Sequence, residues 1–207
     1  KALELAMKHG TRLTLCHIST REEMEMVRAA KANNPDIVAE TSCNYLWFSN
    51  EDYAILGSKV KCNPSVKTPA DRQALRTALS EGLIDTIGSD HAPHLLSEKD
   101  APYTKAPSGL PSIQQTLPVL LTIAQQEEIP LEKIASVFSE KAAEIYELNR
   151  GKIQAGWQAD LVVFDYGKEF TVKAEDQKSK CGWSPYEGQT LKGVIEAVYI
   201  NGKQVNI

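Results

Sequence analysis

Several acid–base side chains follow one short apolar run near the middle of the chain. Residues 84–89 form this β-prone run, and Asp90, His91 and His94 come directly after it. A buried strand with an Asp at its C-terminal tip can present a metal ligand or a general base, as in barrel enzymes. Pro93 cannot continue a ladder of strand hydrogen bonds, so the chain must leave the sheet there. The sequence therefore predicts a reactive carboxylate at the mouth of a strand.

Two other apolar runs end in polar side chains. His17 follows residues 13–16, and Asn63 follows residues 60–62. The C-terminal ends of barrel strands converge on one site, so His17 and Asp90 are expected to approach the same metal ions. Imidazole and carboxylate suit zinc, which lowers the pKa of a bound water. An Asp in contact with that water could take its proton, so the pattern indicates metal-assisted hydrolysis.

Each of these residues also has an ordinary structural explanation. A single His at a strand end, such as His17, is more often a hydrogen-bonded structural residue, and Asp90 could cap a helix or order a loop. Asn63 could belong to a simple turn, and Ser108–Gly109 could be a loop corner. His91 is expected to be structural or to support a residue of the site from behind, because its side chain should point away from that of Asp90 on an extended backbone. Only the combined pattern favours a functional site.

The elements that must position these residues alternate between strand and helix. This alternation predicts an α/β fold with a parallel sheet. A closed (β/α)8 TIM barrel needs eight such units, so the missing ones are expected to precede Lys1. The polar loop 90–110 is long enough to suggest a functional role. The expected strands are 13–16, 37–39, 60–62 and 84–89, and the expected helices are 2–9, 20–31, 69–80, 111–127, 131–137 and 139–147.

The last quarter of the chain has a different pattern. Two apolar runs, 161–164 and 194–200, are separated by a mostly polar stretch, and Asn201-Gly202 is a strong hairpin signal. We therefore expect residues 151–207 to form a small β-sandwich part and residues 1–150 to form the C-terminal part of the barrel.

Composition narrows the classes of protein. The chain has 207 residues, a net charge of −4 and scattered basic residues, which gives no footprint for nucleic acid. No apolar run approaches the roughly 18 residues of a membrane span. The four cysteines lack a C-x-x-C pair, so we expect reduced thiols in a cytoplasmic protein, with Cys16 and Cys62 in the core. The first residues read as the interior of a helix without an N-cap, which suggests a piece of something longer.

Three motifs support a family resemblance. Residues 15–19 (LCHIS), 61–64 (KCNP) and 89–94 (SDHAPH) resemble the sixth-, seventh- and eighth-unit motifs of dihydroorotases in the metal-dependent amidohydrolase superfamily. The chain is similar to the second half of the long bacterial type, which carries a composite β-sandwich. Hydantoinases, dihydropyrimidinases and allantoinases tend to have another residue where His94 stands. His94 therefore favours dihydroorotase among these cyclic amidases.

The resemblance implies a binuclear zinc site in the full-length protein. His17 would ligate the second zinc. Asp90 would ligate the first zinc and act as general base, returning the proton to the departing amide nitrogen. The implied reaction is the reversible hydrolysis of dihydroorotate to N-carbamoyl-aspartate in pyrimidine biosynthesis.

The resemblance also implies the substrate contacts. Asn63 would hydrogen-bond the pyrimidine ring, and His94 would help hold the substrate carboxylate. The backbone at Ser108 and Gly109 would contact the ring from the long loop. The implied partners are this small molecule, the missing N-terminal half, and a homo-oligomer or an aspartate carbamoyltransferase complex, with no nucleic acid or membrane.

Some family features have no counterpart in these residues. The first-strand His-x-His pair, the carboxylated bridging Lys and the fifth-strand His are expected upstream of Lys1, so this chain alone could not build the site. Residues 42–45 read SCNY where many relatives have histidines, and Lys67 stands where many have Arg. Two alternatives stay open: a non-catalytic scaffold partner of aspartate carbamoyltransferase, and a related hydantoinase or allantoinase. Because half a barrel leaves strand edges unpaired, we expect residues 1–207 alone to aggregate or fold loosely.

Overall fold

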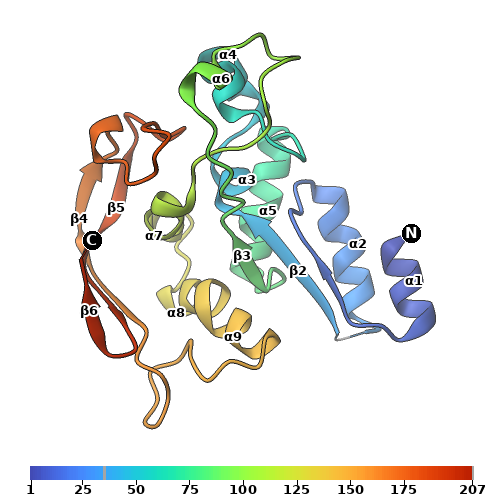
Figure 1. Ribbon diagram of the computed structural model, residues 1–207. Helices are drawn as coiled ribbons and strands as arrows, with labels where there is room; N and C mark the ends of the chain where they lie inside the picture. The colour runs from blue at the N-terminus through green and yellow to red at the C-terminus, as the bar shows by residue number, and fades with distance from the viewer. Residues whose placement is uncertain (35, 207) are drawn as a thin grey trace.

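The computed structural model describes residues 1–34 and 36–206, and its first part is built on a parallel sheet (Figure 1). The strands β1 (Leu13–Leu15), β2 (Ile37–Ser42) and β3 (Thr86–Gly88) lie side by side in that order. Both strand pairs are parallel. The carboxyl ends of the three strands therefore lie at the same edge of the sheet, as the alternating pattern predicts.

Three helices alternate with these strands along the chain: α1 (Ala2–His9) before β1, α2 (Arg21–Lys31) before β2 and α5 (Pro69–Glu81) before β3. The start of α2 is fixed by a capping box, in which the Thr20 hydroxyl accepts from the Glu23 amide and the Glu23 carboxylate accepts from the Thr20 amide. Such caps stabilise a helix by about 1 kcal/mol because they pair amides that lack partners within the helix. A second capping box begins α5, which packs beside α2. These caps fix where the chain enters each helix after leaving the sheet.

The segment between β2 and α5 differs from the sequence expectation. It consists of short helices: α3 (Cys43–Trp47), η1 (Asn50–Asp52), α4 (Tyr53–Leu56) and η2 (Gly57–Val60). The strand expected over residues 60–62 is wrong, because Val60 ends a 3-10 helix and Lys61 and Cys62 continue as loop. The apolar residues Val60 and Cys62 are both buried, but Val60 packs from the end of a 3-10 helix and Cys62 from a loop, rather than from a sheet. A run this short does not distinguish these two cases.

The chain after β3 returns through a mainly helical segment. It comprises α6 (Leu96–Lys99), η3 (Ile113–Gln115), α7 (Thr116–Gln126), α8 (Leu131–Ala135), the π-helical turn η4 (Ser136–Glu140) and α9 (Lys141–Ile145). Helix α7 is buried along most of its length, which agrees with its apolar sequence. The two helices expected over 131–137 and 139–147 are joined by η4.

The C-terminal part contains an antiparallel sheet of β4 (Leu161–Thr171), β5 (Thr190–Ile200) and β6 (Lys203–Val205), with η5 (Ala174–Asp176) in the connection. Strand β5 packs against α7 so closely that a Cβ on Gly193 would lie 2.3 Å from Leu121 Cδ1. Gly193 also has a φ of +85°, a backbone conformation that favours glycine, so a larger residue would be strained at that contact. In the part of the chain that the structure describes, α7 rather than a second sheet covers this face, so the sandwich and the division at residue 150 stay predictions.

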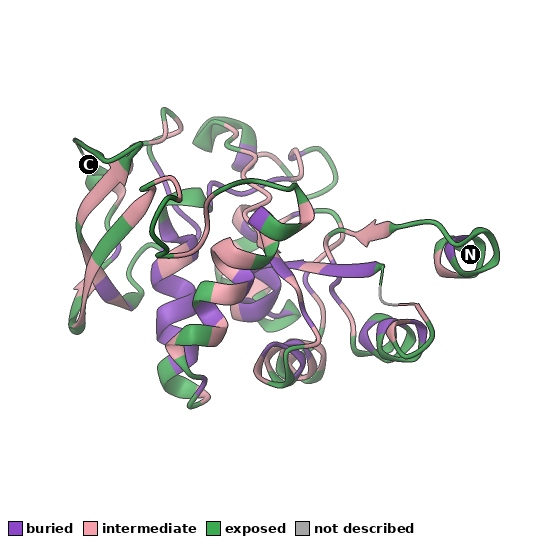
Figure 2. Cartoon of the chain, turned by 90° about the horizontal axis from the view of Figure 1, so that it is seen from below, coloured by how far each residue is buried: buried purple, intermediate pink, exposed green. Residues whose placement is uncertain are grey.

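Burial is greatest where the parallel sheet, α7 and the C-terminal segment meet. Figure 2 shows the buried residues gathered in the middle of the molecule, whereas α1 at the end marked N is largely exposed. Cys62 is buried as expected, but Cys16 is exposed, so its expected core position is wrong. The reason is that Cys16 follows β1, which pairs only with β2 in the described residues. Among those residues, no helix combines the length and apolar character that crossing a bilayer requires.

Candidate functional site

His17 and Asp90 meet at the carboxyl edge of the parallel sheet. His17 follows β1 and Asp90 follows β3, yet His17 Nε2 lies 3.9 Å from Asp90 Oδ1 across the end of β2. Their side chains are 35% and 24% exposed. Both residues have a positive φ, 60° for His17 and 47° for Asp90. A non-glycine residue in this region costs of order 1–3 kcal/mol, and such residues are concentrated at functional sites.

Burial and charge act on the pKa of Asp90 in opposite directions. Partial burial raises the pKa of Asp90 above its ordinary value, and a positive charge on His17 opposes that change. His17 Nδ1 is buried and has no hydrogen-bond partner in the structure, which is uncommon for a buried polar atom. The two side chains could supply an imidazole and a carboxylate to zinc. The described residues contain no group of three or more His, Cys, Asp or Glu side chains suited to a metal, so this pair is a partial ligand set.

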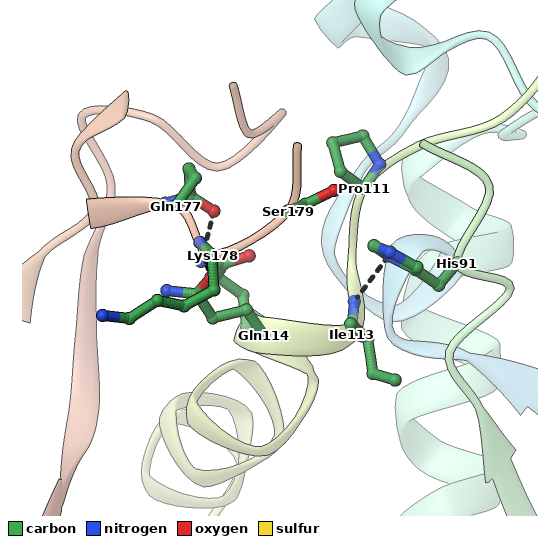
Figure 3. Close-up of a pocket in the computed structure, with 8 residues that line it drawn as sticks. His91, Pro111, Ile113, Gln114, Gln177, Lys178 and Ser179 are labelled. Carbon is green, nitrogen blue, oxygen red and sulfur yellow. Dashed lines mark hydrogen bonds between the residues drawn. The ribbon is translucent and has the colours of Figure 1, made fainter. Parts of the chain in front are cut away.

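His91 holds the backbone at the end of the loop that follows. Its Nδ1 accepts a hydrogen bond from the backbone amide of Ser112 at 3.1 Å. It also accepts one from the Ile113 amide at 3.3 Å, which Figure 3 shows. Burial lowers the pKa of His91, which favours the neutral ring that can accept these bonds. The ring borders a cavity of about 270 Å³ whose far wall includes Gln177 and Lys178. These contacts agree with the structural role expected for His91.

The loop 90–110 brings His94, Ser108 and Gly109 together. His94 Nε2 lies 3.1 Å from the Ser108 carbonyl oxygen, and Trp183 Nε1 donates to the His94 carbonyl at 2.8 Å. Gly109 has a φ of +137°, and a Cβ there would lie 2.6 Å from Ala92 Cβ. Both the backbone conformation and the lack of space therefore require glycine. The loop is folded back tightly onto the segment that begins at Asp90.

Asn63 is exposed and lies on a loop rather than at a strand end, so that part of the expectation is corrected. Its segment nevertheless touches the long loop, because the Gly109 amide donates to the Lys61 carbonyl at 2.9 Å. Burial raises the pKa of the neighbouring Cys62 to about 11, and the Asp90 carboxylate adds to that increase. The influence of Asp90 indicates that this segment lies near the His17–Asp90 pair.

Lys99 belongs to none of the motifs in the sequence, yet it is 1% exposed. Its ammonium group donates to backbone carbonyls in both segments that are expected to contact substrate. A lysine in a polar loop is ordinarily solvated, so composition gave no signal of this burial. Only the contacts between distant residues reveal it.

The chain matches the family model described as "Amidohydrolase family" over residues 1–205. It is 34% identical over 202 residues to the dihydroorotase of Clostridioides difficile, covering 97% of this chain and 48% of that protein. It is 35% identical over 207 residues to the dihydroorotase of Methanosarcina mazei, covering 96% of this chain and 44% of that protein. The chain thus spans about half the length of these curated relatives.

Solved structures of hydantoinases have a fold similar to that of this chain. The L-hydantoinase (dihydropyrimidinase) of Arthrobacter aurescens superposes with a TM-score of 0.93 at 29% identity, covering 99% of this chain and 47% of that one. The D-hydantoinase of a Bacillus species, strain AR9, superposes with a TM-score of 0.92 at 26% identity, with the same coverage. The described α/β arrangement is therefore similar to part of these enzymes.

Proposed function

The chain belongs to the amidohydrolase family, and on that premise we propose that it forms part of a dihydroorotase. The proposed reaction is the reversible hydrolysis of the cyclic amide of dihydroorotate to N-carbamoyl-aspartate, a step of pyrimidine biosynthesis. The observation that carries the proposal is the approach of His17 Nε2 to within 3.9 Å of Asp90 Oδ1 at the carboxyl edge of the sheet. Among the motifs, His94 favours dihydroorotate over other cyclic amides.

His17 and Asp90 would hold zinc together with ligands from sequence outside this chain. The unpartnered, buried Nδ1 of His17 and the adjacent carboxylate support this assignment. When bound, zinc polarises the scissile carbonyl and lowers the pKa of water. The remaining ligands of the binuclear site are proposed to lie upstream of Lys1.

Asp90 is the proposed proton carrier. Hydrolysis forms a bond between the carbonyl carbon and a water oxygen and breaks the bond from that carbon to the ring nitrogen. Asp90 accepts the proton that the attacking water loses and passes it to the departing nitrogen. Its position 3.9 Å from His17 Nε2, at the carboxyl edge of the sheet, supports this role, because a proton carrier must lie within reach of the attacking water.

The substrate would lie against the two backbone segments near Asp90. Asn63, exposed on its loop, would hydrogen-bond the pyrimidine ring. The backbone of Ser108 and Gly109 would contact the ring, and His94 would help hold the substrate carboxylate. The hydrogen bond from the Gly109 amide to the Lys61 carbonyl supports this placement, because it holds the segment before Asn63 next to the segment that contains Ser108.

A second candidate is another cyclic amidase, which the structural similarity to hydantoinases favours. The two candidates differ in the substrate group that His94 would meet, because hydantoin has no counterpart of the dihydroorotate carboxylate.

The test is a substrate panel with the full-length protein. Purified wild type and His94→Ala are assayed with dihydroorotate, hydantoin and allantoin. We expect turnover of dihydroorotate to exceed that of the others, and we expect the substitution to reduce only the dihydroorotate rate. Preferred turnover of hydantoin would support the second candidate. Absence of turnover with all three substrates in the zinc-loaded protein would favour a scaffold that associates with aspartate carbamoyltransferase.

A further inference from the structure

Lys99 lies at the centre of the contact between the two segments described above. Its Nζ donates to the carbonyl oxygens of Pro107 at 2.8 Å, Gly109 at 2.9 Å and Lys61 at 3.2 Å. An ammonium group has three donors and no acceptor, so these three carbonyls match its full hydrogen-bonding capacity. The side chain is therefore held at its tip by both segments.

Burying an ammonium group costs free energy unless its donors are hydrogen-bonded. Lys99 is 1% exposed, and burial lowers its pKa to about 8. The positive charge of Lys61 lowers the pKa further, whereas the nearby Cys62 opposes that change. A lysine is rarely buried this completely without a carboxylate partner. Here carbonyl dipoles take the place of that partner.

The contacts of Lys99 reach the backbone on which substrate binding depends. The Lys61 carbonyl that Lys99 contacts also accepts from the Gly109 amide, and it precedes Asn63 by two residues. The carbonyls of Pro107 and Gly109 flank Ser108, whose own carbonyl faces His94 Nε2. The positions of Asn63, Ser108 and His94 are thus linked through one side chain.

We propose that Lys99 is a positioning residue that fixes the backbone of residues 61–63 and 107–109 against each other and thereby shapes the substrate pocket. The identity of the ligand in this pocket rests on the proposed function. The fixing of the two backbone segments by Lys99 is a claim about the substrate-free protein and does not depend on that identity. Lys99 does not touch the reacting atoms. Its loss is expected to weaken substrate binding more than the chemical step, because the Lys99 ammonium group bonds to Lys61, Pro107 and Gly109 and not to His17 or Asp90.

The main test compares Lys99→Met with Lys105→Met in the full-length, zinc-loaded protein. Methionine keeps much of the length of lysine and removes the donors, and Lys105 is an exposed lysine of the same loop. For Lys99→Met we expect KM for dihydroorotate to rise about tenfold or more while kcat changes by less than about threefold. Lys105→Met should match wild type. An unchanged KM for dihydroorotate would overturn the proposal, whether or not kcat falls.

Hydrogen exchange of the substrate-free protein separates this inference from the proposed function. In Lys99→Met, peptides covering residues 100–110 should exchange faster, and peptides covering α5 and α7 should exchange as in wild type. This result would support the loop-fixing role even if dihydroorotate proved not to be the substrate. Unchanged exchange in the loop would refute the role even if the enzyme were active.

A fallback variant covers the case in which Lys99→Met does not fold. Lys99→Gln keeps an amide donor on a shorter side chain. The steady-state kinetics and the hydrogen exchange are then measured on this variant with the same expected results. If neither variant folds, the proposal is overturned, because Lys99 would then be needed for the whole fold rather than for these two segments.

Discussion

Tyr186 joins the C-terminal segment to α3, the helix that follows β2, and Tyr186→Phe tests how much that contact stabilises the protein. Both Tyr186 and Asn44 are 0% exposed. The Tyr186 hydroxyl donates to Asn44 Oδ1 at 2.7 Å and lies 3.4 Å from Cys43 Sγ. The ring also packs 4.9 Å from the ring of Phe48, centroid to centroid, so Phe at position 186 keeps the packing and loses only the hydroxyl.

The expected cost follows from what the substitution leaves behind. Asn44 Nδ2 already lacks a hydrogen-bond partner, so losing the hydroxyl deprives this buried amide of its strong partner at Oδ1 as well. Leaving a buried acceptor unsatisfied costs about 1–3 kcal/mol, and we expect about 2 kcal/mol for Tyr186→Phe. Removing both polar groups in Tyr186→Phe/Asn44→Leu should cost less than the sum of the single changes, with a coupling free energy of about 1 kcal/mol.

The assay is urea unfolding of the full-length protein, followed by tryptophan fluorescence and circular dichroism. With a slope of about 3 kcal/mol/M, a loss of 2 kcal/mol moves the midpoint down by about 0.7 M. Tyr146→Phe is the control, because Tyr146 is 69% exposed. A midpoint for Tyr186→Phe equal to that of the control, or strictly additive costs in the double variant, would refute this reasoning.

Two further predictions concern the loop and the acid stability of the fold. Gly109→Ala should destabilise the protein by about 2 kcal/mol more than Gly188→Ala in urea unfolding, because both have positive φ but only Gly109 is crowded by Ala92; equal costs would contradict this. Burial alone would raise the pKa of Glu127, but hydrogen bonds from Arg76 and Gln73 outweigh it and lower that pKa. Glu127 therefore stabilises the fold above its unfolded-state pKa, and this contribution is lost as pH falls through its folded-state pKa. The difference in unfolding free energy between wild type and Glu127→Gln should shrink as the pH is lowered through this range; a constant difference would show that the depressed pKa contributes nothing.

The sequence was sufficient to predict the meeting of His17 and Asp90. Both follow short β runs in an alternating strand–helix pattern, and parallel strands bring their carboxyl ends to the same edge. Helix boundaries were also close where local signals are strong, as at the capping box before α2. In these places the information lies within a few residues of the feature it determines.

The sequence was insufficient where contacts between distant residues decide the structure. The run at 60–62 has the composition of a strand, but in the structure Val60 ends a 3-10 helix and the next two residues form a loop. The apolar run before His17 suggested a buried Cys16, but that residue lies past the paired part of an edge strand. Lys99 shows the same limit, because its partners are backbone carbonyls up to 38 residues away, which no side-chain pattern records.

The steady-state turnover of dihydroorotate by full-length Asp90→Asn tests the central claim most directly. Asparagine keeps the shape of the side chain and cannot carry the proton, so kcat should fall by about 10²–10⁴-fold while the urea midpoint stays near that of wild type. Asp100→Asn, at an exposed position of the same loop, should keep wild-type turnover. Turnover by Asp90→Asn within about threefold of wild type would contradict the assignment of Asp90 as the proton carrier.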